Sequence, residues 1–182
     1  MIKSAKKALH NLKKLKGKVE FRQNDVLELS SCKDFKNAFD IAITERCLIN
    51  LIDLKSQIKA LSEIAFILKK QGLFLMCEDT LGGLTSLNSL RKKLQLPEIK
   101  TRWHNVYLAE KPFLEAVSKL FDLISIKNIS STYYMVSRVI YARLAADSGV
   151  EPEYLHPINR IAAQLPYIGD YGPLKLFVFR KK

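Results

Sequence analysis

Three short polar stretches could together bind a ligand, because each one follows a segment that is predicted to be a strand. They are Asn24 and Asp25, Thr44 to Arg46, and Glu78 to Thr80. In an open parallel sheet, ligands lie outside the carboxyl ends of the strands, where loop residues are free of ladder hydrogen bonds. The stretches therefore indicate a shared ligand crevice. An equal alternative is that Asp25 and Asp79 only cap or turn the chain.

A second group of residues with chemical potential lies in the downstream half of the chain. It combines aromatic rings with directional polar groups, namely Trp103, His104, Asn105, Tyr107, Tyr133, Tyr134 and Arg138. An aromatic wall with a few polar groups is typical of a pocket for a small or sugar-like molecule. Ordinary packing is the favoured alternative for Trp103 and the tyrosine pair, and pairing with a carboxylate is favoured for Arg138.

The elements that must position these residues follow from hydrophobic periodicity. Residues 41–44 and 73–80 are apolar runs typical of buried strands. Between them, residues 53–72 carry an apolar stripe at helical spacing, so we expect a helix that Asp53 caps and that ends at Gly72. A strand, a crossover helix and a strand predict a parallel sheet with helices on both faces.

The start of the chain predicts a basic amphipathic helix. Ile2, Ala5, Leu9 and Leu12 recur at steps of three and four residues, without a capping residue before them. Residues 1 to 18 contain seven lysines and no acid, which is more than half of the formal charge of +12. A solvated helix face is favoured over a nucleic-acid site.

The alternation of apolar residues after this helix predicts a short strand over 19–23.

The downstream half alternates helices with two more strands. Helices are predicted at 83–96, 112–121 and most of 133–164, and strands at 122–130 and 174–181. The two strands can lie beside each other in opposite directions. Because no repeat or Pro/Gly linker interrupts the sequence, we expect one domain over 1–182, with a helical substrate-side region at about 81–165.

The composition argues against several other classes of protein. A hydrophobic content of 48% with 26% charged residues is typical of a globular chain. Three scattered cysteines and three scattered histidines predict neither a disulfide framework nor a metal site, so reduced thiols and a cytoplasmic location are expected. No apolar run approaches the roughly 20 residues that span a bilayer, so we expect no membrane partner.

Three stretches carry a resemblance to a known family. In order and spacing, VEFRQNDVLEL, FDIAITERCLINL and ILKKQGLFLMCED resemble the middle of class I S-adenosylmethionine-dependent methyltransferases. The resemblance implies a Rossmann-like α/β fold with an antiparallel final strand, and S-adenosylmethionine as cofactor. It places Asp25 on the adenine amino group and the backbone amide of Val26 at the ring. The implied cofactor-binding residues are Asn24, Asp25, Val26, Thr44, Glu45 and Arg46.

Four downstream blocks, LNSLRKKLQLP, RWHNVYL, STYYMVSRVIYA and HPINRIAAQLP, resemble the substrate-facing half of one bacterial subgroup of these enzymes. This implies methyl transfer to a small-molecule or sugar-like acceptor. The implied acceptor-binding residues are Glu78, Trp103, Asn105, Tyr107, Tyr133 and Arg138. Methyl transfer is an in-line displacement, so a base is needed only for an acceptor atom that carries a proton. His104 is the expected catalytic base, with a backbone-bonded loop imidazole as the equal alternative.

Two features of the family are absent from this sequence. None of the seven glycines forms a Gly-rich turn after a strand, and no acidic strand end is present for the ribose hydroxyls. The family orders its strands three, two, one, four, five, seven, six, so strands one and two would lie between 19–23 and 41–44. We therefore expect an open apolar edge at 41–44, and little or no cofactor binding by these 182 residues alone.

Three explanations of the missing features are open. A true start further upstream is favoured over pairing with another polypeptide or a rearranged fragment, and it predicts an upstream reading frame that encodes both features.

Two other functions also remain open. One is a basic nucleic-acid-associated protein, whose affinity would fall steeply with added salt. The other is a non-catalytic subunit that completes a partner methyltransferase, or a homo-oligomer, through the open sheet edge.

Overall fold

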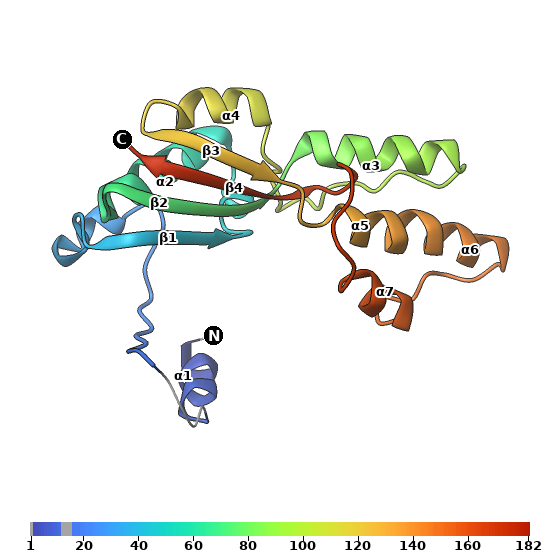
Figure 1. Ribbon diagram of the computed structural model, residues 1–182, viewed down its shortest axis with the longest axis horizontal. Coiled ribbons are helices and arrows are strands. Elements are labelled where there is room, and N and C mark those ends of the chain that lie inside the picture. Colours follow the sequence, from blue (N-terminus) through green and yellow to red (C-terminus); the bar gives the residue numbers. More distant parts are fainter. Residues whose placement is uncertain (1, 12–15) are drawn as a thin grey trace.

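The computed structural model describes residues 2–11 and 16–182, and Figure 1 shows the arrangement of their elements. A four-stranded sheet forms one half of the molecule, and a group of helices extends from one end of it. The elements, in chain order, are α1 (Ile2–His10), η1 (Leu29–Ser31), η2 (Lys33–Phe35), β1 (Phe39–Glu45), η3 (Leu48–Asn50), α2 (Leu54–Ile67), β2 (Leu68–Asp79), α3 (Leu81–Lys93), α4 (Glu110–Val117), β3 (Phe121–Lys127), α5 (Ser131–Tyr134), the π-helical η4 (Met135–Ile140), α6 (Tyr141–Asp147), α7 (Pro157–Ala162) and β4 (Leu174–Lys181).

The strand order is β1-β2-β4-β3. β1 and β2 are parallel, and β4 runs antiparallel to both of its neighbours, β2 and β3. This order matches strands four, five, seven and six of the methyltransferase sheet, including its reversed last strand. The predicted α/β fold class, with an antiparallel C-terminal strand and without the first two strands, is therefore confirmed.

The core lies on one face of this sheet. Phe74 and Met76 from β2 and Phe177 and Phe179 from β4 are buried beneath α2 and α4, which Figure 1 shows on the same side of the sheet. Three of the core phenylalanines have ring centroids 5.7–6.2 Å apart, namely Phe74, Phe121 and Phe179. Burial of such large apolar side chains is the main stabilising contribution of this half of the molecule.

The opposite face of the sheet corrects the expectation of helices on both faces. On β1, Ile41 and Ile43 are 51% and 70% exposed, and Leu123 on β3 is 46% exposed. The first helix does not cover them: within the parts that the structure describes, α1 buries no residue, and Figure 1 shows it apart from the sheet. Leu12, the last member of its predicted apolar stripe, lies outside the described residues.

The predicted strand at 19–23 is wrong. These residues have no regular structure, because the described part of the chain has no strand beside them to accept their ladder hydrogen bonds. The predicted end of the central helix is also wrong, since α2 ends at Ile67 and Lys69 to Gly72 belong to β2. Its start is confirmed: Asp53 Oδ1 accepts a hydrogen bond from the Ser56 amide at 2.7 Å.

The helical half begins where the strands end. The predicted long helix at 133–164 instead ends at Asp147, and a loop containing Gly149 in the left-handed region (φ 69°) and Pro152 leads to α7. Hydroxyl groups at the start of α5 hold the returning chain: Ser131 Oγ and Thr132 Oγ1 each donate to a carbonyl of segment 166–168 at 2.6 Å. These bonds fix α5 against the segment that leads into β4.

Candidate functional site

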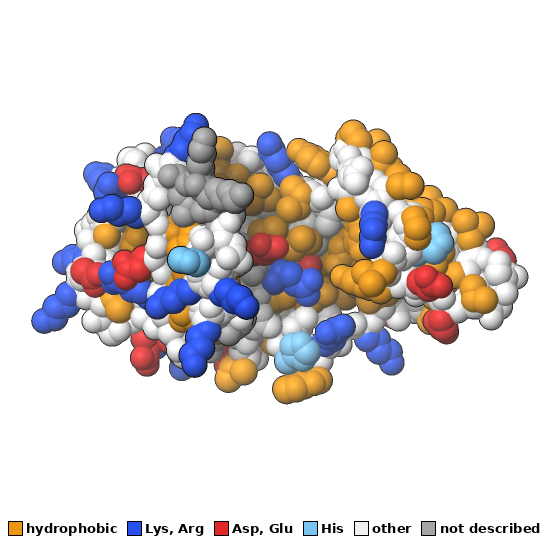
Figure 2. Space-filling model, turned by 90° about the horizontal axis from the view of Figure 1, so that it is seen from below, with side chains coloured by type: hydrophobic (Ala, Val, Ile, Leu, Met, Phe, Trp, Pro, Cys, Tyr) orange, Lys and Arg blue, Asp and Glu red, His pale blue; other side chains and the backbone are white. Residues whose placement is uncertain are grey.

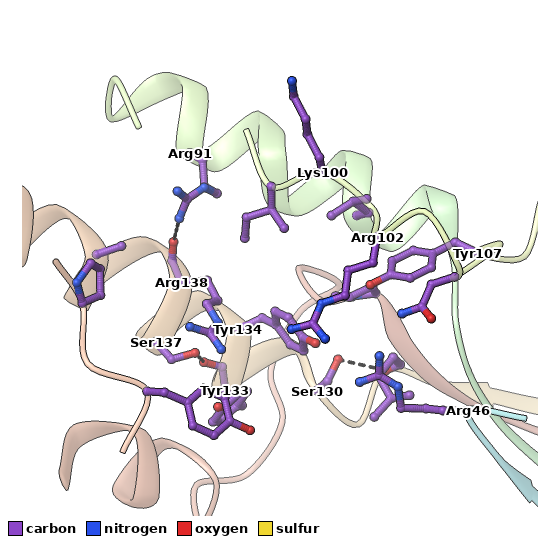
Figure 3. A pocket seen from close by; sticks show the side chains of 18 of the residues that line it. Arg46, Arg91, Lys100, Arg102, Tyr107, Ser130, Tyr133, Tyr134, Ser137 and Arg138 are labelled. Carbon is purple, nitrogen blue, oxygen red and sulfur yellow. Dashed lines mark hydrogen bonds between the residues drawn. The ribbon is translucent and has the colours of Figure 1, made fainter. Parts of the chain in front are cut away.

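A large cavity lies at the carboxyl ends of β1 and β2, between the sheet and the helices α3 and α5 to α6. Its volume is about 1020 Å³. Figure 2 shows the hollow between the two halves of the molecule, with basic and acidic side chains on its floor, and Figure 3 shows its lining. Polar and aromatic lining residues include Arg46, Arg91, Lys100, Arg102, Asn105, Tyr107, Ser130, Tyr133, Tyr134, Ser137, Arg138, Glu151 and Tyr154.

Arg46 and Asp79 form an ion pair at the end of the sheet. Arg46 directly follows β1 in the left-handed backbone region (φ 49°), and its N–H donates to the carbonyl of Cys77 at 2.8 Å. A left-handed conformation costs a residue other than glycine roughly 1–2 kcal/mol, and such strain concentrates at functional sites. The conformation brings Arg46 Nη2 within 3.1 Å of Asp79 Oδ2, and Asp79 is fully buried.

Two tyrosines stand beside this ion pair. Burial raises the pKa of Tyr107, and the negative charge of Asp79 acts in the same direction. Burial also raises the pKa of Tyr134 to about 12, with further contributions from Asp79 and Tyr107. Burial raises the pKa of Asp79 as well, while the charge of Arg46 opposes that shift. Both phenols are consequently protonated near neutral pH and can donate a hydrogen bond to a ligand.

Glu78 has a role that differs from the predicted contact with an acceptor. Its side chain is fully buried, and its carboxylate accepts hydrogen bonds from the amides of Cys47, Leu48 and Ile49 at 3.0–3.2 Å. These amides are the unsatisfied donors at the start of η3, so Glu78 holds the turn that follows β1. Burial raises the pKa of Glu78, although the three N–H groups act to lower it.

The loop that carries Asn105 and Tyr107 is fixed to the same turn. The Val106 amide donates to the Ile49 carbonyl at 2.6 Å. Gln57 of α2 donates from Nε2 to the Val106 carbonyl at 2.9 Å and to the Leu48 carbonyl at 3.3 Å. Because Gln57 is buried, these bonds are shielded from water and make the position of the loop specific.

A second, more open hollow of about 700 Å³ lies on the other side of the end of β1. Gln23, Asn24, Asp25, Val26 and Cys47 line it. Asp25 Oδ1 accepts a hydrogen bond from the Leu27 amide at 2.8 Å, which makes an Asx turn around Val26. Within the described chain the Val26 N–H has no acceptor. A carboxylate acceptor and a free amide donor thus lie one residue apart.

The structure brings together most, but not all, of the residues predicted from the sequence. Asn24, Asp25 and Val26 line the smaller hollow, while the large cavity receives Asn105, Tyr107, Tyr133, Arg138 and also Arg46, which was predicted to contact the cofactor. Thr44 and Glu45 are the last residues of β1 and line neither. Arg46 lines the large cavity, and the next residue, Cys47, lines the smaller hollow.

His104 and Trp103 lie outside the cavity, on the exposed turn after Arg102. Trp103 is 95% exposed, and its ring contacts that of His104 edge to face at 5.2 Å. Trp103 therefore neither packs in a core nor lines the site. The imidazole of His104 does not line the cavity, because the turn directs it outward while Asn105 and Tyr107 continue into the cavity wall.

Arg138 also differs from its expected environment. Among the residues that the structure describes, it has no carboxylate partner, and its guanidinium lies 5.7 Å from the ring centroid of Tyr154. Sequence reasoning missed three other basic residues of the cavity, which are Arg91, Lys100 and Arg102. Arg102 belongs to the block RWHNVYL. The spacing of residues in this block did not show that Arg102 lines the cavity while Trp103 faces solvent.

The described part of the chain has neither a metal-binding cluster nor a membrane-spanning helix. No group of three or more His, Cys, Asp or Glu residues is arranged to hold a metal ion there. None of the described helices is long and apolar enough to cross a membrane.

The fold is similar to solved methyltransferase structures, at low sequence identity. A SAM-dependent methyltransferase from Methanosarcina mazei has a TM-score of 0.57 and 14% identity, over 100% of this chain and 76% of that one. A protein from Pyrococcus horikoshii has a TM-score of 0.54 and 14% identity, over 100% and 65%. The [4+2]-cyclase SpnF has a TM-score of 0.52 and 17% identity, over 99% and 60%.

These similarities show the fold and leave the reaction open, since SpnF is a cyclase and one fold serves several chemistries. The chain spans 52–76% of the length of the solved chains compared with it. No protein-family model matches the sequence, and no curated protein matches it.

Proposed function

We propose that this chain supplies the acceptor side of a class I S-adenosylmethionine-dependent methyltransferase and takes part in methyl transfer to a small-molecule or sugar-like acceptor. The observation that carries the proposal is the pair of hollows that flank the end of β1. One presents Asp25 and Val26, the other is a polar, aromatic cavity, and the neighbouring residues Cys47 and Arg46 line one hollow each. Fold similarity to methyltransferases supports it.

The smaller hollow fits the adenine end of the cofactor. The edge of adenine carries an amino donor beside a ring nitrogen acceptor. Asp25 offers a carboxylate to the donor, and Val26 offers an amide N–H that has no internal acceptor in the described chain. The bound cofactor would supply the electrophilic methyl group. The residues at Arg46 and Cys47 would border the end of the cofactor that faces the large cavity.

The large cavity would orient the acceptor and exclude water from it. The protonated phenols of Tyr107 and Tyr134 can donate hydrogen bonds to the acceptor, and the ring of Tyr133 offers an apolar surface. Asp79, a fully buried carboxylate behind the cavity wall, acts on Tyr107 and would reach an acceptor only through that phenol. Positioning of this kind contributes a large part of the rate in displacement reactions.

The test is a titration of the ¹⁵N-labelled chain with S-adenosylhomocysteine, followed by amide NMR. Because the sequence has no Gly-rich turn after a strand, we expect weak affinity, in the millimolar range. Shifts should be concentrated at Val26, Leu27 and Cys47. Asp25→Ala should weaken binding by about tenfold or more through loss of one charge-assisted hydrogen bond. The matched control is Asp122→Ala, an exposed carboxylate on β3. Shifts confined to other residues would contradict the proposal.

The open sheet edge favours a second candidate, a subunit whose sheet is completed by another polypeptide. β1 has β2 on one side and no described strand on the other, and its Ile41 and Ile43 are exposed. An apolar edge of this kind is a template for strand pairing. Molecular mass from light scattering tests this candidate: a dimer or larger species supports it, and a stable monomer at high concentration contradicts it.

A further inference from the structure

The large cavity carries an excess of positive charge. Five lining residues are basic, namely Arg46, Arg91, Lys100, Arg102 and Arg138, and one is acidic, Glu151. Two of the basic groups are already satisfied by the protein. Arg46 is paired with Asp79 at 3.1 Å, and the buried guanidinium of Arg91 donates to the carbonyls of Pro97 and Arg138. The remaining positive charge lacks an acidic partner within the described chain.

Two of the remaining groups face each other across the cavity. Figure 3 shows Arg102, on the loop after α3, and Arg138, on the π-helical η4, directing their guanidinium groups toward Tyr134 from opposite walls. Lys100 extends away from this point in the same view. Two guanidinium groups repel each other, and more strongly in a partly enclosed cavity than in water. An anion between them would offset this repulsion and receive several charge-assisted hydrogen bonds.

Because Arg46 is paired with an acid, the uncompensated positive charge is unevenly distributed in the cavity. At the end next to β1, the charge of Arg46 is compensated by Asp79, so an anionic group gains little there. The charges of Arg102, on the loop after α3, and Arg138, on η4, are uncompensated in the described chain. An anionic ligand would therefore place its charged group between Arg102 and Arg138 and its uncharged end near Arg46 and the smaller hollow.

We propose that the acceptor carries an oxyanion, either a carboxylate or a phosphate, that Arg102 and Arg138 bind together. Its body lies against the tyrosine rings, and the atom to be methylated is at the opposite end, beside Tyr107 and Arg46. The identity of the ligand as an acceptor rests on the proposed function. The oxyanion site itself rests on the charge and geometry of the cavity, and it can be tested without any methyl transfer.

The test uses three probes with the same aromatic body: phenyl phosphate, benzoate and uncharged benzyl alcohol. Each is titrated into the ¹⁵N-labelled chain, and both the amide and the arginine side-chain Nε–H signals are followed. We expect one or both anions to shift the signals of Arg102 and Arg138, with an affinity that falls as salt is added. The stronger of the two anions identifies the source of the oxyanion. Benzyl alcohol should bind at least about tenfold more weakly.

Substitutions make the result specific. Arg102→Gln and Arg138→Gln should each weaken anion binding by about tenfold or more, and the double variant should abolish it. Arg102 is exposed on a loop, so its variant is expected to keep the fold, which the unchanged amide spectrum will show. Arg180→Gln, an exposed arginine on β4 outside the cavity, is the matched control and should bind as the unsubstituted chain does.

Two outcomes would overturn the oxyanion site: equal binding of the three probes, or unchanged anion binding by the double variant. Neither depends on S-adenosylhomocysteine. Failure of the proposed function would appear instead as the absence of cofactor shifts at Val26 and Cys47, with the anion result intact.

Discussion

Replacement of Glu78 tests whether this residue positions the site. Its carboxylate accepts three amide hydrogen bonds, and two of these amides, from Leu48 and Ile49, belong to fully buried residues. An unsatisfied buried donor costs about 1–3 kcal/mol, while removal of a buried charge returns part of that cost. We therefore expect Glu78→Ala to lower the free energy of unfolding by about 3–4 kcal/mol.

The matched variant is Glu78→Gln, which keeps one carbonyl oxygen for the amides of Cys47 and Leu48 but turns its own N–H₂ group toward Ile49. We expect an intermediate loss of about 1–2 kcal/mol. Urea denaturation measures both variants, and an unchanged slope of free energy against urea would show that the change lies in stability. Glu45→Gln, at the exposed end of β1, should have no effect. Stability of Glu78→Ala equal to that of the unsubstituted chain would refute the reasoning.

The pH dependence gives an independent check on Glu78. Burial raises its pKa above the ordinary 4.5, so the folded state holds this proton at a pH where the unfolded state has released it. By linkage, the contribution of Glu78 to stability falls as the pH rises from 4.5 through the raised pKa. Glu78→Gln cannot titrate and should lack this part of the slope. An identical slope in the two proteins would show that Glu78 titrates as it does in the unfolded chain.

Three further predictions concern the surroundings of the cavity. A spectrophotometric titration should find a tyrosine transition near pH 12 that Tyr134→Phe removes. Because the phenol ionises near pH 10 in the unfolded chain, the stability of the fold should fall as the pH rises from 10 to 12. Gly172→Ala should lower the unfolding free energy by about 1–3 kcal/mol, measured in urea, because its Cβ would lie 2.3 Å from Ser130 Oγ. Buried Lys175 pairs with Glu110 and Asp170 at 3.0 and 3.2 Å. Lys175→Met should therefore lower the unfolding free energy, measured in urea at neutral pH. The loss should be much smaller at low pH, because both acids are uncharged at low pH.

Hydrophobic pattern predicted the strands of the sheet, and the helix between the first two predicted their parallel direction. The runs at 41–44 and 174–181 lie in strands, and the run at 73–80 does so up to Asp79, because apolar β-branched and aromatic runs of this length favour a strand within a sheet. The boundary at Lys69 to Gly72 was missed. Lysine and glycine signals there indicated a helix end, but pairing of β2 with β1 and β4 extended the strand instead.

The strand predicted at 19–23 failed for a tertiary reason. Alternation of apolar residues shows that a segment can be a strand, yet a strand forms only where a neighbour accepts its hydrogen bonds. The capping of α2 by Asp53 succeeded because it depends on residues three apart in the chain. The cap was therefore predictable from the sequence, whereas the helix end at 69–72 was decided by strand pairing.

The sequence by itself determined the α/β class, the start of α2 at Asp53 and the polar turn at Asp25. Only the tertiary structure decided which side chains enter the site. His104 lies two positions after Arg102 and three before Tyr107 in one loop, yet His104 is exposed outside the cavity while the other two line it. Glu78 and Asp79 are adjacent, but opposite sides of one strand send Glu78 to the η3 amides and Asp79 to Arg46. Side-chain direction depends on the neighbours that pack against the backbone, and those neighbours are distant in sequence.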